Sequence, residues 1–103
     1  MIVALPLFGS EISPRFDCAG KFLLAKIEEG RIVEMIPIGM EESNSIQRAR
    51  SLSDRKVSKV ICGGIDDFSM RLLNGWGIQV IPWVSGDAKQ ALERFVKEIP
   101  SRP

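Results

Sequence analysis

The sequence predicts a single α/β domain, on three observations. Short apolar segments alternate with segments of helical periodicity, a hairpin signal interrupts this alternation near the N-terminus, and no internal repeat is visible. The chain has 103 residues, 45% of them apolar and 26% charged, which is the composition of one globular domain with its own core. We expect the domain to span residues 1–99, followed by a short C-terminal tail over residues 100–103.

Five segments are predicted as strands because they are short, apolar and bounded by glycine or proline. They are Met1 to Leu5, Phe22 to Ile27, Ile32 to Ile36, Lys59 to Cys62 and Ile78 to Ile81. The residues Glu28-Glu29-Gly30-Arg31, between the second and third segments, are typical of a hairpin turn. Pro37 and Gly39 are expected to end the third strand.

Three segments are predicted as helices, and each follows a residue that can cap a helix start. The candidate caps are Ser43 or Asn44, Asp66 or Asp67, and Ser85 or Asp87. The apolar faces expected to pack on the sheet are Ile46, Ala49 and Leu52 in the first helix, Ile65, Phe68, Leu72 and Leu73 in the second, and Ala88, Leu92, Phe95, Val96 and Ile99 in the third.

This order of elements predicts a mixed five-stranded sheet with three helices. Helical crossovers make the first, fourth and fifth strands parallel, and the hairpin adds two strands beside the first, so the expected order is 3-2-1-4-5. That is a ribonuclease H-like arrangement. The loops after the parallel strands, at residues 6–20, 63–66 and 82–86, should then meet at one edge, where open α/β sheets bind their ligands.

Several classes of activity are excluded by what the sequence lacks. It contains no His and no Tyr, which rules out a Ser-His-Asp triad, a Cys-His pair and any imidazole metal ligand. Met1 to Leu5 carries no carboxylate, so two-metal nuclease chemistry is not expected. We therefore expect no enzyme, and a formal charge of +1 argues against non-specific nucleic-acid binding.

The cellular compartment is expected to be the cytoplasm. The apolar N-terminus has no basic region of the kind found in signal peptides. The longest uncharged run, Leu72 to Gly86, is too short and too interrupted to span a bilayer, so no membrane partner is expected. Cys18 and Cys62 are two isolated cysteines and do not form a disulfide framework.

The candidate site lies in two of the strand-end loops. Cys62, Gly63 and Gly64 stand between a predicted strand and a predicted helix start, where backbone N–H groups can hold an anion and glycines let a ligand approach. Arg15 and Cys18 lie in the loop after the first strand, and a thiolate near an arginine can bind a soft metal.

Structural alternatives stay open for these features. Gly63 and Gly64 can be a plain tight turn and both cysteines can be inert, while Asp66 and Asp67 would repel an anion. The basic residues of the segment 48–59 (Arg48, Arg50, Arg55, Lys56 and Lys59) can face solvent, or meet a phosphate or an acidic partner. Trp76 and Trp83 can be core residues or a partner surface.

The order of several short motifs resembles one known family. The motifs are Ser13-Pro14-Arg15-Phe16-x-x-Ala19-x-x-Phe22, Ile46-Gln47-x-Ala49, Ile61-Cys62-Gly63-Gly64-Ile65, Gly77-Ile78-x-Val80 and Ala88-x-x-Ala91-Leu92-x-x-Phe95. Together they resemble the dinitrogenase iron–molybdenum cofactor biosynthesis family, whose fold is ribonuclease H-like. Arg15 and Asp17 stand where the family's Ser-x-His-Phe-Gly motif has His and Gly.

The resemblance implies a non-catalytic carrier or accessory protein for an iron–sulfur or iron–molybdenum-type cofactor precursor. Its partners would be the metallocluster and a donor or acceptor protein. Without histidine, Cys18 and Cys62 are the remaining soft metal ligands, with Met40 or Met70 as weaker candidates. The alternative is an interaction domain of the same fold that has lost cofactor binding.

Overall fold

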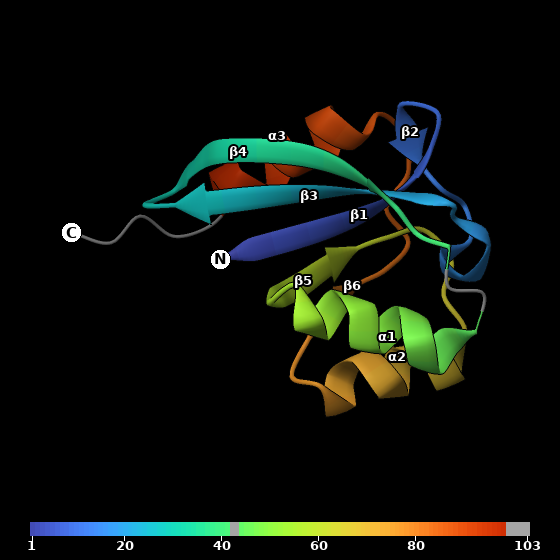
Figure 1. Cartoon of the computed structure of the whole chain (residues 1–103). Coiled ribbons are helices and arrows are strands. Elements are labelled where there is room, and N and C mark those ends of the chain that lie inside the picture. The colour runs from blue at the N-terminus through green and yellow to red at the C-terminus, as the bar shows by residue number, and fades with distance from the viewer. Residues whose placement is uncertain (42–43, 99–103) are drawn as a thin grey trace.

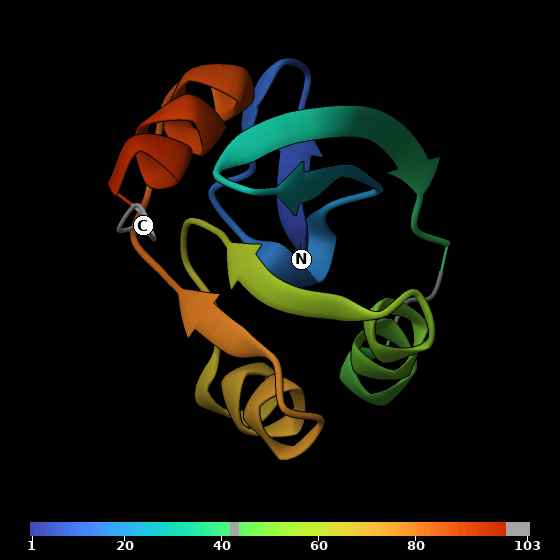
Figure 2. The same ribbon diagram turned by 90° about the vertical axis from the view of Figure 1, so that its left-hand side faces the viewer.

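In the computed structural model, which describes residues 1–41 and 44–98, one curved mixed sheet separates two helices from a third (Figures 1 and 2). The strands are β1 (Ile2–Phe8), β2 (Glu11–Ile12), β3 (Lys21–Glu28), β4 (Arg31–Gly39), β5 (Val57–Ile61) and β6 (Gln79–Ile81). The helices are α1 (Ser45–Asp54), α2 (Asp67–Gly75) and α3 (Ala88–Glu98), and a 3-10 turn, η1, spans Phe16–Cys18. The predicted α/β class and the three helices are confirmed.

The sheet has six strands where five were predicted. Its order is β4-β3-β1-β5-β6, and the short β2 pairs only with β1. β1, β5 and β6 are parallel to one another, while β3 and β4 form the antiparallel hairpin. The sequence pattern missed β2 because a strand of two residues shows no periodicity. Gly9, at φ +63°, makes the tight turn that folds β2 back onto β1.

The edge strand β4 also runs further than predicted. It continues through Pro37 to Gly39, paired with β3 along its length. Proline is tolerated in a strand at the edge of a sheet, where the missing N–H need not serve a neighbouring strand. Pro37 therefore does not end the strand as expected.

Alternation along β1 divides the core into two layers. Ala4 faces the layer under α1 and α2, whereas Val3 and Leu5 face the layer under α3. The helices add Leu52 and Leu73 to the first layer, with the fully buried Leu92 in the second. Phe68, expected in the core, is 56% exposed, because only one narrow face of α2 meets the sheet.

The helix starts are set by side-chain caps. Asn44 Oδ1 accepts from the Gln47 N–H at 2.8 Å, Asp66 Oδ2 from the Ser69 N–H at 2.9 Å, and Asp87 Oδ2 from the Gln90 N–H at 3.0 Å. The alternative cap Ser43, the residue Ile99 and the predicted tail 100–103 lie outside the described residues. Within the described part of the chain, no helix has the length and apolar character needed to cross a membrane.

Candidate functional site

The loops that follow β1, β5 and β6 meet at one edge of the sheet, as the parallel order predicts. The Phe16 N–H donates to the Gly64 carbonyl at 2.9 Å, and the Gly64 N–H donates to the Pro14 carbonyl at 2.8 Å. The Trp83 N–H donates to the Gly63 carbonyl at 3.0 Å. Backbone hydrogen bonds thus join all three loops into one layer around Gly63 and Gly64.

Gly63 and Gly64 serve this loop packing. A Cβ atom at Gly63 would lie 2.7 Å from the Ser13 carbonyl oxygen, and one at Gly64 would lie 2.9 Å from the Pro14 carbonyl oxygen. Both distances are too short for a side chain, so the glycines are required by a neighbouring loop. The close approach predicted for a ligand is already occupied by the chain itself.

Cys62 lies in the core. Its exposed fraction is 0%, and it packs in the layer that contains Phe16, Phe22 and Leu73. Burial raises the pKa of the Cys62 thiol from 9.0 to about 12, which further disfavours the thiolate that binds a metal, and the closed core leaves a metal no access to the sulfur. We therefore do not retain Cys62 as a metal ligand, and the predicted pair of metal-binding thiolates is reduced to Cys18.

Cys18 and Arg15 lie on the same exposed turn. Cys18 ends η1 and is a free, exposed cysteine. The Arg15 guanidinium donates from Nε to Asp17 Oδ1 at 3.2 Å and from Nη2 to Asp17 Oδ2 at 2.8 Å. The hydrogen bonds and charge of Asp17 raise the pKa of Arg15 above its ordinary value, so the guanidinium remains charged but already has a carboxylate partner.

The start of α2 is occupied by its own cap. Besides the Ser69 N–H, Asp66 accepts the Ser69 hydroxyl at 2.7 Å, and that hydroxyl also contacts Ser45 Oγ at 2.9 Å. The hydrogen bonds from Ser69, and secondarily the charge of Arg15, hold the pKa of Asp66 below its ordinary value. An ionised carboxylate at this helix start disfavours the anion site that the glycine-containing loop suggested.

Arg48 is a buried residue whose place the sequence pattern had left open between solvent and a partner. Only 5% of it is exposed, and its Nη1 donates to the carbonyl oxygens of Phe16 at 3.3 Å and Ala19 at 2.7 Å. Its Nε is buried and has no hydrogen-bond partner among the described residues. Arg48 therefore holds η1 against α1; its place one turn before the buried Leu52 was the available signal.

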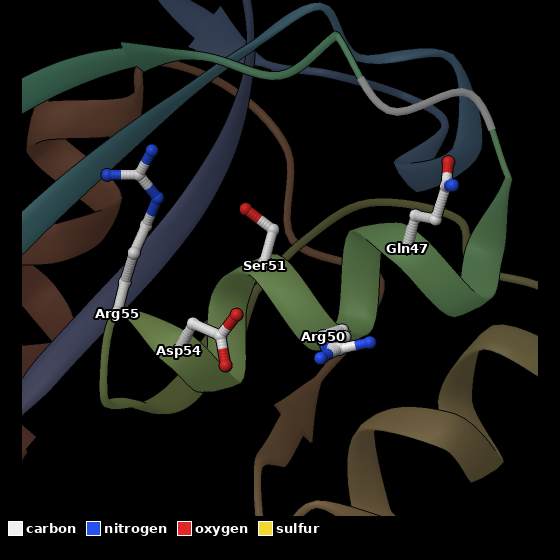
Figure 3. A pocket seen from close by; sticks show the side chains of 5 residues that line it. All are labelled: Gln47, Arg50, Ser51, Asp54 and Arg55. Carbon is white, nitrogen blue, oxygen red and sulfur yellow. The ribbon is translucent and has the colours of Figure 1, made fainter.

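Of the other basic residues in this segment, Arg50 lies on the outer surface of α1 and Arg55 at its C-cap, whereas Lys56 follows the helix and Lys59 lies in β5. Gln47, Arg50, Ser51, Asp54 and Arg55 line a shallow pocket of about 440 Å³ (Figure 3). All five come from this one helix and its C-cap, and Asp54 lies between the two arginines in sequence. In Figure 3, Gln47, Ser51 and Arg55 point to one side of α1, away from Arg50. The pocket is therefore a solvated helix face, without groups converging from a second element.

A second hollow opens at the strand-end edge, with a volume of about 460 Å³. The loop layer around Gly63 and Gly64 forms part of its wall, together with the exposed aromatic residues Phe8 and Trp83. Trp83, left open between core and surface by the sequence, is 79% exposed, and Trp76 is 52% exposed. Phe8 was not predicted, because the first strand was expected to end before it.

The fold and the site define a small α/β domain that carries an exposed thiol and an arginine on one strand-end turn. Among the described residues, no group of three or more His, Cys, Asp or Glu could hold a metal ion. The chain belongs to the dinitrogenase iron–molybdenum cofactor family, whose sequence profile matches residues 1–98. This confirms the resemblance seen in the motifs.

Several solved structures with a similar fold are 18–22% identical in sequence to this chain. At this level of identity, the similarity concerns the fold alone. MJ0327 from Methanocaldococcus jannaschii superposes with a TM-score of 0.80 at 20% identity, over 94% of this chain and 88% of that one. The apo form of the orange protein from Desulfovibrio gigas superposes with a TM-score of 0.78 at 18% identity, over 98% of this chain and 92% of that one. No curated protein sequence matches the chain.

Proposed function

We propose that this chain is a non-catalytic accessory protein that carries an iron–sulfur or iron–molybdenum-type cofactor precursor as cargo. The family membership supports this class of function. The observation that carries it is the exposed Cys18 on η1, a turn held against the body of the domain by Arg48 and by the Gly64 backbone. A thiolate on a supported, exposed turn can ligate a soft metal cluster.

The donor set decides what kind of carrier this could be. Iron–sulfur clusters are held by several cysteine thiolates, usually four. Here one cysteine is exposed and the other is sealed in the core, so the chain does not fit a cluster enclosed by its own residues. A cargo cluster would take one thiolate from Cys18; on the isolated chain, sulfide or small thiols would complete its coordination, and during transfer the donor or acceptor protein would supply the other ligands. Transfer between partners suits this arrangement better than storage.

Anaerobic reconstitution of the full chain with ferrous iron and sulfide, with and without molybdate, tests the proposal. After removal of small molecules, we expect a visible charge-transfer spectrum and retained metal that are lost in Cys18→Ser. The matched control is Cys62→Ala, which should keep both signals because Cys62 is not a ligand. Retention in Cys18→Ser, or loss in Cys62→Ala alone, would overturn the proposed site.

The runner-up is an interaction domain of the same fold that has lost cofactor binding. The missing group of metal ligands among the described residues and the burial of Cys62 favour it. Reconstitution that leaves no metal on the wild-type chain would select this alternative. For either function, we infer from the strand order that the fold is ribonuclease H-like. We also infer that the protein acts in the cytoplasm.

A further inference from the structure

The hollow at the strand-end edge is a second candidate site, away from the thiol. It is lined by Phe8, Glu11, Ile12, Pro14, Gly63, Gly64, Trp83, Val84, Ser85 and Gly86. Phe8 is 73% exposed and Trp83 79%, and these are the two most exposed large apolar side chains among the described residues. Two exposed aromatic rings on one hollow mark an interaction surface.

The position of Trp83 is imposed on it by its surroundings. Its φ of +65° is one that bulky residues rarely adopt. Its N–H is bonded to the Gly63 carbonyl, and the next N–H, that of Val84, is bonded to the Cys62 carbonyl at 2.9 Å. A Cβ atom at Gly64 would lie 3.7 Å from the Trp83 ring, so the ring stands beside Gly64. Strained backbone retained in this way is typical of binding sites.

The rim of the hollow is acidic. Glu11 lines it, and the backbone of Glu11 pairs with that of Asp87 in an isolated antiparallel bridge, so Asp87, whose carboxylate caps α3, is the residue opposite Glu11. Neither carboxylate forms a salt bridge within residues 1–41 and 44–98, and the residues that line the hollow include no lysine or arginine.

We propose that this hollow docks a segment of a partner protein in which a cationic side chain stands beside an apolar one. The apolar residue would fill the floor formed by Ile12, Pro14 and Val84. The cation would lie over the Trp83 ring, where cation–π attraction operates, and close to Glu11. Glu11 is the charged residue that lines the hollow, so charge complementarity selects a basic partner. The proposal is independent of any cluster on Cys18.

Fluorescence titration of the full chain with blocked tripeptides tests the proposal. The probes are acetylated and amidated Leu-Arg-Leu, Leu-Gln-Leu, Leu-Glu-Leu and Gly-Arg-Gly, read by Trp83 in a Trp76→Phe background. We expect Leu-Arg-Leu to bind at least about fivefold more tightly than the neutral peptide, and the acidic and glycine peptides to bind more weakly still.

Three variants separate this pocket from non-specific attraction. Glu11→Gln should weaken Leu-Arg-Leu about fivefold and leave Leu-Gln-Leu unchanged. Trp83→Gly, read by amide chemical shifts, should abolish binding while keeping the fold, because glycine accepts the positive φ. Glu34→Gln removes an exposed carboxylate on β4, outside the hollow, and should leave the affinity for Leu-Arg-Leu unchanged. The proposal is overturned if the neutral peptide binds as tightly as the basic one, if Glu34→Gln weakens binding as much as Glu11→Gln, or if no peptide binds.

Discussion

The guanidinium of Arg48 donates a 2.7 Å hydrogen bond to the carbonyl oxygen of Ala19, across 29 residues of sequence. Through this bond and the one to Phe16, helix α1 supports the turn that carries Arg15 and Cys18. The turn is also anchored by the fully buried Phe16 and by the Gly64 carbonyl, and Arg48 adds a buried, charged hydrogen-bond donor. This contact couples the core of the domain to its exposed thiol.

Replacing Arg48 by Met should lower the free energy of unfolding by about 1–3 kcal/mol, because two buried carbonyl groups lose a charged donor. Urea denaturation measures the loss. The matched control, Arg50→Met on the exposed face of α1, should stay within about 0.5 kcal/mol of the wild type. The Cys18 thiol of Arg48→Met should also react faster with iodoacetamide, since its turn is released. Equal denaturation midpoints for the two variants would contradict the supporting role of Arg48.

Gly64→Ala should destabilise the domain by about 1–3 kcal/mol, because the new methyl group lies 2.9 Å from the Pro14 carbonyl and the loop layer must shift. Gly75→Ala is the control of opposite sign. Its Cβ meets nothing within 4 Å and it lies in α2, so it should stabilise by about 0.5–1 kcal/mol. Thermal or urea unfolding compares the two. A tolerated Gly64→Ala would show that the loops are not packed as closely as described.

The stability of the wild type should fall at alkaline pH through Cys62. Its pKa is raised from 9.0 to about 12 by burial, so the unfolded chain releases this proton before the folded chain does. The contribution is complete below pH 9.0 and is lost as pH rises towards 12, by up to about 1.4 kcal/mol per pH unit.

Urea denaturation at pH 8 and pH 10.5 measures this dependence. Cys62→Ala should show a smaller decrease between the two pH values than the wild type, since lysine and other groups titrate equally in both. In native protein at pH 8, one thiol should react with Ellman's reagent quickly and the other only on unfolding. Two thiols of equal reactivity would refute the burial of Cys62.

Asp66→Ala should cost about 1 kcal/mol, because the start of α2 loses the cap on the Ser69 N–H. Asp66→Asn keeps a side-chain oxygen that can accept the Ser69 N–H, so it should lower the free energy of unfolding by only a few tenths of a kcal/mol. The pKa of Asp66 is lowered from 3.8, so its contribution is present above pH 3.8 and is lost as pH falls through the lowered value. Acid denaturation should therefore come at higher pH for Asp66→Ala than for the wild type if unfolding is followed by circular dichroism. Equal losses in both variants would show that capping is not the role of this side chain.

Local patterns in the sequence were sufficient for five of the six strands, the three helices and their order. Apolar runs bounded by glycine and proline marked β1, β3, β4, β5 and β6, and helical periodicity with capping residues marked the three helices. Strands joined by a helical crossover are parallel, and the two strands of a hairpin lie side by side. The order of these five strands, and the edge at which the loops of the parallel strands meet, therefore followed from connectivity. The motif order likewise led to the family that residues 1–98 match.

Which side chains reach solvent was decided by the tertiary structure. Cys62 and Cys18 look alike in the sequence, but the end of β5 turns one thiol into the core and η1 exposes the other. The sequence left Arg48 among basic residues that face solvent or a partner, yet the carbonyl groups of a turn 29 residues away make its burial favourable. Phe8 and Trp83, 75 positions apart, line one hollow only because β1 and β6 end at the same edge. Local periodicity specifies an element and its apolar face, whereas the environment of a single side chain depends on what the rest of the chain brings against it.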